Sequence, residues 1–253
     1  MLRKRVNLLG INIDDISLDR ATFLAYKSLR GGKRRSFFTP NLEMLSSAQK
    51  NEEIKKMLNS ASVSLPDGFS LKIIAKILGK EIKHTVAGIE FGEALVEIAE
   101  KEGARVFLLG GRKGVAPRAA KSILAKHPSL RVCGTFHGYF TAKHIPAVAR
   151  MIEKSGADIL IVCQGFPKQE HFANFVMKNT EFVKVVACLG GAFDIWSGDL
   201  ERAPKSMRDI HAEWLWRIIQ EPSRLERFVK SLDAFPCALE KGIEKMLLCG
   251  MKR

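Results

Sequence analysis

The sequence predicts an α/β protein with a mostly parallel sheet, helices on both faces of the sheet and a C-terminal helical appendage. Short apolar runs alternate with longer amphipathic segments, which is typical of β-α units that form a parallel sheet. Several of the apolar runs end in glycine or proline turns, as strands do when a helix follows. After about Gly198 the strand pattern stops and the remaining chain looks helical.

Each element is predicted from its own pattern. Short apolar runs are expected to form strands at 6–11, 35–39, 61–65, 105–109, 131–135, 159–163 and 184–189. Amphipathic segments are expected to form helices near 18–30, 42–59, 69–78, 89–102, 115–127, 142–155, 168–179 and 205–220. The 253 residues allow one sizeable domain, so we divide the chain into a core over 1–198 and an appendage over 199–253.

Charge and cysteine use limit the cellular context. The net charge of +14 favours an anionic partner, which can be nucleic acid, anionic lipid or a phosphorylated ligand. No run of about 18 apolar residues occurs, so we expect a cytoplasmic protein that can still lie on a membrane. The cysteines show no CxxC spacing, and Cys133, Cys163 and Cys188 lie in apolar runs. They are therefore expected to be buried free thiols in a reducing compartment.

The appendage carries a basic amphipathic pattern. An apolar stripe is expected from Trp214, Ile218, Leu225, Phe228 and Leu232, beside the basic residues Arg217, Arg224, Arg227 and Lys230. A helix with tryptophan and arginine can lie in a membrane interface. The same stripe can instead pack on the core or on another subunit, as in a homo-oligomer, and the sequence leaves these alternatives open.

Polar residues in the strand-end turns are the best site candidates, because open parallel sheets bind ligands at the carboxyl ends of their strands. Asp67 follows an apolar strand within Leu-Pro-Asp-Gly, where it can either form the turn or accept a proton. Thr39 and Asn41 lie in Thr-Pro-Asn and can either cap a helix or contact a ligand. Gln169 and Glu170 begin a helix after a Gly-x-Pro turn, where Glu170 can complement the helix dipole.

A glycine turn at Gly110 and Gly111 joins a strand to a helix that begins near residue 115. Exposed N–H groups at such a helix start favour phosphate, although the same glycines can serve turn geometry alone. The spacing is not a full GxGxxG, and the next strand ends without an acidic residue for a ribose hydroxyl. A dinucleotide-dependent oxidoreductase is therefore disfavoured.

Other chemistries lack their motifs. The sequence has no HExxH, no GxSxG elbow, no P-loop and no Asp-x-Asp that would hold a metal on a diphosphate. Chemistry without a metal or other cofactor is therefore expected. A nucleic-acid-binding module remains an alternative because of the charge, but the basic residues are dispersed and no binding motif occurs, so no nucleic-acid partner is expected.

An ordered series of motifs resembles one enzyme family. The motifs are TPNLE (39–43), LPDGFS (65–70), VAGIE (86–90), FLLGG (107–111), GTFHGYF (134–140), GFPKQE (165–170), GGAFD (190–194), RAP (202–204), EWLWR (213–217) and EPSR (221–224). Together they resemble the WecG/TagA/CpsF glycosyltransferases over roughly residues 5–230. The resemblance implies a Rossmann-like core and an appendage that completes the site at the inner face of the cell membrane, where the protein would be peripheral.

The resemblance also implies a reaction in cell-envelope polysaccharide synthesis. The enzyme would transfer N-acetylmannosamine, or its uronic acid, from a UDP donor to undecaprenyl-diphosphate-linked N-acetylglucosamine, with inversion and without metal. The alternative within the family is a glucosyl-type transferase that uses another UDP-hexose for exopolysaccharide or capsule.

Roles are carried over residue by residue. Asp67 matches the proposed general base, and Thr39, Asn41 and Gln169 match residues that orient the sugars. Gly110 and Gly111 would let the nucleotide approach the backbone, and Asp194 is a further candidate for donor contact. The candidates to neutralise the diphosphate are Arg202, Arg217, Arg224 and Arg227.

One position departs from the family pattern. Family members often have a basic residue directly before Val-Ala/Thr-Gly, where this chain has Thr85. Lys83, two residues upstream, is the candidate to replace that charge. The change leaves the identity of the donor open.

Overall fold

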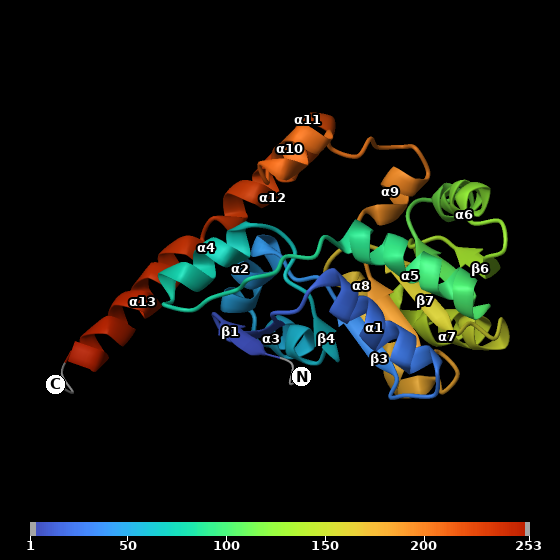
Figure 1. Ribbon diagram of the computed structural model, residues 1–253, viewed down its shortest axis with the longest axis horizontal. Helices are drawn as coiled ribbons and strands as arrows, with labels where there is room; N and C mark the ends of the chain where they lie inside the picture. The colour runs from blue at the N-terminus through green and yellow to red at the C-terminus, as the bar shows by residue number, and fades with distance from the viewer. Residues whose placement is uncertain (1–3, 251–253) are drawn as a thin grey trace.

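The computed structural model describes residues 4–250. Its centre is a six-stranded sheet in the order β4-β3-β8-β7-β5-β6, in which every neighbouring pair is parallel (Figure 1). The strands are β3 (Arg35–Phe38), β4 (Val63–Ser64), β5 (Arg105–Gly110), β6 (Arg131–Phe136), β7 (Ile159–Cys163) and β8 (Val185–Cys188). The predicted α/β fold with a parallel sheet is confirmed.

Alternating side chains on the strands divide the core into two layers. In β7, Ile159 and Ile161 face one layer, while Leu160 and Val162 face the other. The first layer is covered by α1 (Leu18–Leu29), α5 (Gly88–Glu102), α6 (Val115–Lys126) and α9 (Ala192–Trp196). The second layer is covered by α2 (Leu42–Lys50), α3 (Glu52–Asn59), α4 (Ser70–Ile77), α7 (Ile145–Lys154) and α8 (Lys168–Asn179). Strands buried on both faces explain the near-continuous apolar runs of the sequence.

The N-terminal segment differs from its prediction. A single strand was expected over 6–11, but the chain forms an antiparallel hairpin of β1 (Arg5–Leu8) and β2 (Ile11–Asp14). Leu9 and Gly10 make the two-residue turn with φ values of 52° and 88°, which suits a hairpin whose twist requires positive φ. The Asn7 side chain accepts a hydrogen bond from the Gly10 N–H at 3.0 Å and stabilises this turn.

Three predicted helices are interrupted. The segment 42–59 divides at Asn51, whose extended backbone ends α2 and whose side chain accepts from the N–H groups of Glu53 and Ile54. Such a cap begins a new helix rather than continuing the old one. The segment 142–155 starts as a 3-10 turn, η1 (Ala142–His144), before α7. The segment 205–220 divides into α10 (Lys205–Asp209) and α11 (Glu213–Gln220), with His211 at a φ of 60° between them.

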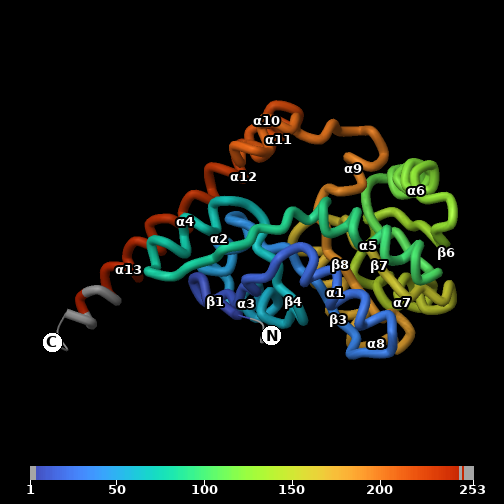
Figure 2. Tube along the Cα trace, in the orientation of Figure 1, coloured from blue at the N-terminus to red at the C-terminus, as the bar shows by residue number. Residues whose placement is uncertain are grey.

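The C-terminal region is helical, as predicted. It continues through α12 (Arg224–Ser231) into α13 (Ala234–Gly250), which runs along α2 and α4 (Figure 2). Ala234 and Ala238 are buried in the second core layer, and a Cβ on Gly242 would lie 2.7 Å from the Ile77 carbonyl oxygen. Residues 251–253 of the predicted appendage lie outside the described residues. The boundary at 198 stays a prediction, although α13 shares the core of α2 and α4.

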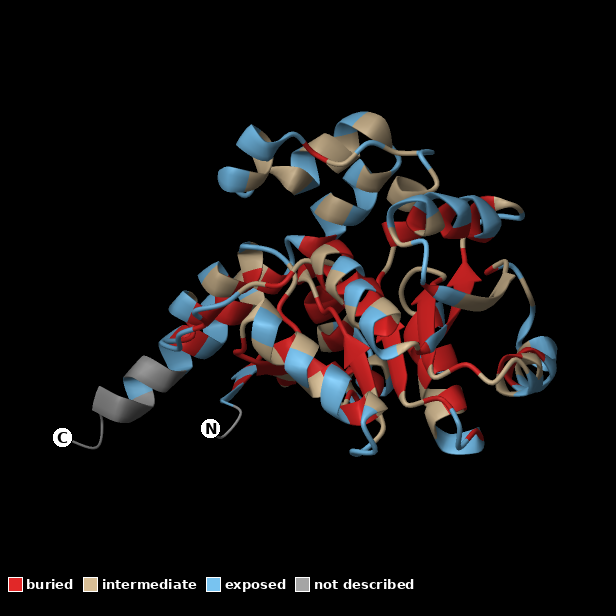
Figure 3. Ribbon diagram, turned by 45° about the vertical axis from the view of Figure 1, so that its right-hand side comes forward, coloured by how far each residue is buried: buried red, intermediate tan, exposed pale blue. Residues whose placement is uncertain are grey.

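The sheet and the C-terminal helices differ in how far their residues are buried. Strands β3, β4, β5, β7 and β8 are mainly buried and the edge strand β6 is mainly half-buried, whereas α10, α11 and α12 show mainly exposed and half-buried residues (Figure 3). Cys163 and Cys188 are buried free thiols, and Cys133 is half-buried. Within residues 4–250, no helix is both long enough and apolar enough to cross a membrane.

Candidate active site

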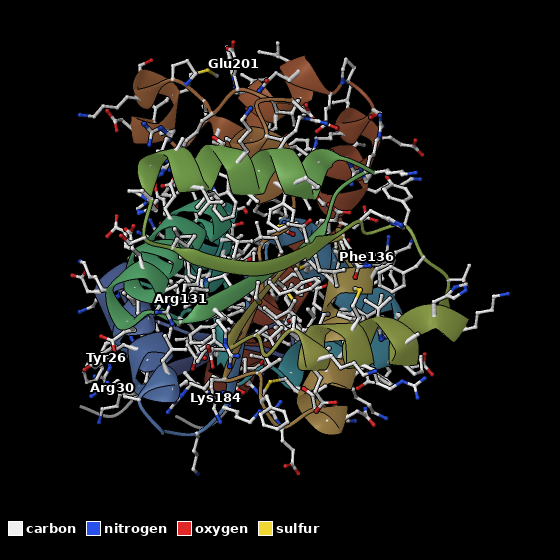
Figure 4. All side chains as sticks on the ribbon, turned by 90° about the vertical axis from the view of Figure 1, so that its right-hand side faces the viewer. Tyr26, Arg30, Arg131, Phe136, Lys184 and Glu201 are labelled. Atoms are coloured by element: carbon white, nitrogen blue, oxygen red, sulfur yellow. The ribbon has the colours of Figure 1, made fainter. Side chains whose placement is uncertain are left out.

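Loops from distant parts of the chain meet at the carboxyl edge of the sheet. The Asp67 N–H donates to the Pro40 carbonyl at 3.0 Å and joins the loop after β4 to the loop after β3. The Thr39 Oγ1 donates to the Cys188 carbonyl at 3.1 Å and joins β3 to β8. In Figure 4, Glu201 of the appendage lies on the opposite side of the molecule from Lys184, which precedes β8. The appendage therefore lies on the side of the strands' carboxyl ends.

The Asp67 carboxyl is held in an unusual electrostatic environment. Burial raises its pKa from 3.8 to about 7, and the nearby charges of Glu213 and Glu90 raise it as well. The positive charge of Arg217 and a hydrogen bond from the Gly88 N–H act in the opposite direction and stabilise the carboxylate. Glu213 and Arg217 come from α11, so the appendage contributes directly to the surroundings of Asp67. A carboxyl that titrates near neutral pH can accept a proton as a general base.

Thr39 and Asn41 lie on the loop that follows β3. Thr39 is only 3% exposed, and its hydroxyl donates to the Cys188 carbonyl. Asn41 caps α2, where its Oδ1 accepts from the Met44 N–H at 3.1 Å. Both side chains thus have a structural partner, and their contact with a sugar stays a prediction.

Gln169 is fully buried beside the same edge. Its Oε1 accepts from the Gly190 N–H at 3.0 Å, and its Nε2 donates to Glu170 Oε1 at 2.8 Å. Both ends of the amide are therefore used within the protein. Gln169 supports the turn after β8, and its direct contact with a sugar stays a prediction.

Gly110 and Gly111 are required by close backbone packing. A Cβ on Gly110 would lie 2.2 Å from the Cys163 carbonyl oxygen, and one on Gly111 would lie 2.7 Å from the Val115 side chain. The Gly111 N–H donates to the Cys163 carbonyl at 2.9 Å. These contacts explain the glycines by geometry, and the approach of a nucleotide to this turn stays a prediction.

Asp194 and Arg224 meet above the turn after β8. A Cβ on Gly191 would lie 3.3 Å from Asp194 Oδ2 and 3.6 Å from an Arg224 guanidinium nitrogen. Burial and the negative charge of Glu221 raise the pKa of Asp194, while Arg224 lowers it. Because Arg224 belongs to α12, this is a second place where the appendage reaches the sheet edge.

Three of the predicted arginines are paired with glutamates. Arg202 bridges Glu90 at 2.9 Å and Glu93 at 3.2 Å, both on α5. The other two pairs lie within the appendage, Arg217 with Glu213 and Arg224 with Glu221.

Arg227 lies one turn after Arg224 on α12 and is exposed. Residues three apart share a helix face, so Arg227 lies beside Arg224. Lys83, the candidate to replace the charge missing at Thr85, has its ammonium 3.9 Å from the Glu81 carboxylate.

Several residues near Asp67 had no role in the sequence prediction. Glu90 and Glu213 act on its charge, and Phe69 stacks on His211 with ring centroids 4.6 Å apart and planes 6° apart. This stack joins the Asp67 loop to the turn between α10 and α11. No sequence pattern pairs residues so far apart, although Glu90 and Glu213 fall within the VAGIE and EWLWR motifs.

Among the described residues, no group of three or more histidine, cysteine, aspartate or glutamate side chains is arranged to hold a metal ion. Cationic side chains at the sheet edge include Arg217 and Arg224 of the appendage, which act on Asp67 and Asp194, and Arg112 after β5, which also acts on Asp194. The arrangement joins a carboxyl that can accept a proton to guanidinium groups that can stabilise anionic oxygens.

Comparison with known proteins identifies the chain. Residues 6–245 match the model of the family described as Glycosyl transferase WecG/TagA/CpsF. The chain belongs to this family. The match covers nearly the whole length of this glycosyltransferase, from the N-terminal hairpin to α13.

Two curated relatives are similar to this glycosyltransferase. Both are named N-acetylglucosaminyldiphosphoundecaprenol N-acetyl-beta-D-mannosaminyltransferase. The protein from Bacillus spizizenii (strain ATCC 23059 / NRRL B-14472 / W23) is 32% identical over 192 residues. The protein from Bacillus subtilis (strain 168) is 30% identical over 192 residues. Each match covers 76% of this chain and 73% of the relative.

The family assignment confirms the predicted glycosyltransferase. The dinucleotide-dependent oxidoreductase and the nucleic-acid-binding module are accordingly set aside.

Proposed function

We propose that this glycosyltransferase moves N-acetylmannosamine from UDP-N-acetylmannosamine to undecaprenyl-diphosphate-linked N-acetylglucosamine, with inversion at the sugar. The names of the two relatives support this donor and acceptor. The observation that carries the mechanism is the Asp67 carboxyl, with its pKa raised to about 7 at the carboxyl edge of the sheet.

Asp67 serves as the general base. It takes the proton from the attacking hydroxyl of the acceptor, whose oxygen forms a bond to the anomeric carbon as the bond to the UDP oxygen breaks. The electron pair of that bond leaves with UDP. A base is most effective when its pKa lies near the working pH, and burial brings Asp67 into that range.

The appendage stabilises the leaving diphosphate. Arg217 is close enough to Asp67 to lower its pKa, and Arg224 lies at Gly191 beside Asp194. Guanidinium groups can form paired hydrogen bonds to phosphate oxygens and can supply the positive charge for a reaction without metal. Glu213 and Glu221 hold these arginines before the diphosphate competes for them.

The remaining edge residues orient the donor. We place the diphosphate between the Gly110–Gly111 turn and the Gly190–Gly191 turn, with Asp194 toward the ribose or sugar hydroxyls. Thr39 and Asn41 lie on the adjoining loop, next to Asp67 through the Asp67–Pro40 hydrogen bond. Orientation of two substrates can supply a large part of an enzyme's rate.

The appendage also brings the enzyme to its lipid-linked acceptor. Apolar side chains at least 39% exposed occur along α10 to α13, at Ile210, Trp214, Leu215, Ile219, Leu225, Val229, Leu232, Leu239, Ile243 and Leu247. Together with the +14 net charge, they fit a peripheral position on the anionic inner face of the cell membrane. In this proposal, the arginines of the appendage would meet the prenyl diphosphate as it enters from the membrane.

Mass spectrometry of a reaction with a prenyl-diphosphate N-acetylglucosamine analogue tests the proposal. UDP-N-acetylmannosamine is compared with its uronic acid, UDP-N-acetylglucosamine and UDP-glucose. We expect efficient transfer from the first donor. A preference for UDP-glucose would instead support the glucosyl-type alternative.

The Asp67→Asn variant tests the base in the same assay. Loss of a general base should lower turnover by about 100-fold to 10,000-fold, because asparagine keeps the shape but cannot take the proton. UDP binding, measured by calorimetry, should stay close to that of the parent. Undiminished transfer by Asp67→Asn would remove Asp67 from the mechanism.

A further inference from the structure

Glu170 is a buried carboxyl for which the mechanism above has no role. It lies in the first turn of α8, is 0% exposed, and its Oε2 has no hydrogen-bond partner among residues 4–250. Burial raises its pKa to about 7. A buried carboxyl with one oxygen unsatisfied costs stability, and an apolar side chain at this position would avoid that cost.

The other carboxyl oxygen takes part in a short hydrogen-bond chain. Glu170 Oε1 accepts from Gln169 Nε2 at 2.8 Å, and Gln169 Oε1 accepts from the Gly190 N–H at 3.0 Å. The two ends of a glutamine amide have nearly the same shape but opposite hydrogen-bonding roles. An acceptor at position 170 therefore turns the NH₂ group of Gln169 toward itself and the oxygen toward Gly190. The Gly190 N–H favours the same orientation, and the acceptor at position 170 strengthens it, because a flipped amide would set its oxygen against Glu170 Oε1 as well as its NH₂ group against the Gly190 N–H.

The turn that receives the hydrogen bond carries part of the site. Gly190 has a φ of 60°, and the next residue, Gly191, lies against Asp194 and Arg224. A flipped Gln169 amide would point NH₂ at the half-buried Gly190 N–H, leaving two donors face to face without an acceptor. The turn would then move, and with it the surface on which Asp194 and Arg224 meet.

We propose that Glu170 is a positioning residue. Its Oε1 fixes the orientation of the Gln169 amide, and this amide holds the Gly190–Gly191 turn against which Asp194 and Arg224 are placed. The effect on transfer rests on the proposed function, whereas the hydrogen-bond chain does not.

Amide hydrogen exchange at Gly190 tests the chain without requiring activity. In Glu170→Met, which has similar length but no acceptor, exchange at Gly190 should become about tenfold faster as local protection is lost. The amides within β8 should be unchanged. In the control Glu170→Gln the new side-chain oxygen can still accept from Gln169, so exchange at Gly190 should stay near that of the parent.

A double variant tests the route of action. If Glu170 acts through Gln169, then Gln169→Met should accelerate exchange at Gly190 as Glu170→Met does, and the double variant should be no faster than Gln169→Met alone. Unchanged exchange in Glu170→Met, equal loss of protection in Glu170→Gln, or multiplying effects in the double variant would each overturn the proposal. Should Glu170→Met fail to fold, Glu170→Leu, which also lacks an acceptor, decides the proposal through the same amide.

Enzyme activity is measured in the same variants as amide hydrogen exchange. The Michaelis constant for the UDP-sugar and the turnover should both worsen in Glu170→Met and recover in Glu170→Gln, while the melting temperature stays level or rises in both. If the unaltered enzyme shows no transfer from UDP-N-acetylmannosamine, the proposed function fails, but the exchange result still judges the role of Glu170.

Discussion

At the scale of the residue, the chemistry of Asp67 depends on charges that oppose one another. Burial, Glu213 and Glu90 raise its pKa, and Arg217 together with the Gly88 N–H lowers it. The result is a carboxyl that changes charge near neutral pH. Its environment, more than its residue type, makes Asp67 suitable as a base.

The pH profile of kcat/KM should report these opposing charges. Because the carboxylate is the active form of the base, activity should rise with pH through a limb near 7. Glu213→Gln removes a negative neighbour, which favours the carboxylate and moves the limb to lower pH. Arg217→Gln removes a positive neighbour, which disfavours the carboxylate and moves the limb to higher pH.

Measurement of the limb in the two variants provides its own control, because the shifts must have opposite signs. Both substitutions also break the Arg217–Glu213 ion pair at 3.2 Å, so a shared shift in one direction would indicate a structural effect of that pair. Profiles that do not move would show that these two side chains do not set the pKa of Asp67.

At the scale of the element, the appendage is joined to the core at separate points. Phe69 stacks on His211 near Asp67, Arg202 bridges α5, and α13 packs along α4. Arg217 and Arg224 lie between these points along the chain. The positions of these two arginines over the sheet edge therefore depend on contacts that the arginines themselves do not make.

Phe69→Ala tests the contact nearest the base. Loss of the stack should free the 66–70 loop from α10 and α11 and lower turnover by about tenfold, a cost of ~1.4 kcal/mol that one stacked aromatic pair can account for. UDP binding should change less than turnover. The matched control is Phe182→Ala, since Phe182 is 60% exposed and lies just before the amino end of β8. Equal activities of the two variants would argue against the stack as a positioning contact.

At the scale of the whole molecule, exposed apolar side chains recur along the helices of the appendage. Leu225, Val229 and Leu232 are exposed on or next to α12, and Leu239 and Ile243 continue the spacing on α13. Trp214 and Phe228 stack with ring centroids 4.5 Å apart and join α11 to α12. The same surface that would meet the membrane thus also carries Arg217 and Arg224 on its helices.

Serine at Leu239, Ile243 and Leu247 tests this surface. Each exposed leucine or isoleucine that enters an interface contributes roughly 1–2 kcal/mol, so the triple variant should bind anionic vesicles at least about 100-fold less tightly. Sedimentation with phosphatidylglycerol vesicles measures the loss, and Phe182→Ser serves as the control.

Two results would contradict the membrane assignment. One is unchanged vesicle binding by the triple variant. The other is a change from dimer to monomer without loss of vesicle binding, which would assign the surface to a second copy of the chain. Binding of the parent should weaken as salt rises, because the net charge is +14.

Much of this protein could be predicted from sequence because the signals are local. Buried parallel strands need apolar runs, so all six strands of the sheet lie where such runs were expected. The hairpin at Leu9 and Gly10 and the helix breaks at Asn51 and His211 were missed. Each depends on the backbone conformation of one or two residues within an otherwise continuous pattern.

The sequence by itself determined the fold class, the family and the candidate base, because periodicity and ordered motifs are properties of the chain. Only the tertiary structure decided how Asp67 is surrounded, that Gln169 is turned inward onto Gly190, and which arginines reach the sheet edge. The surroundings of Asp67 arise from burial and from the charge of Arg217, which lies more than a hundred residues away along the chain. Gln169 and Gly190 are brought together by the packing of α8 beside β8. Desolvation and Coulomb energy depend on distance in space, which no spacing along the chain encodes.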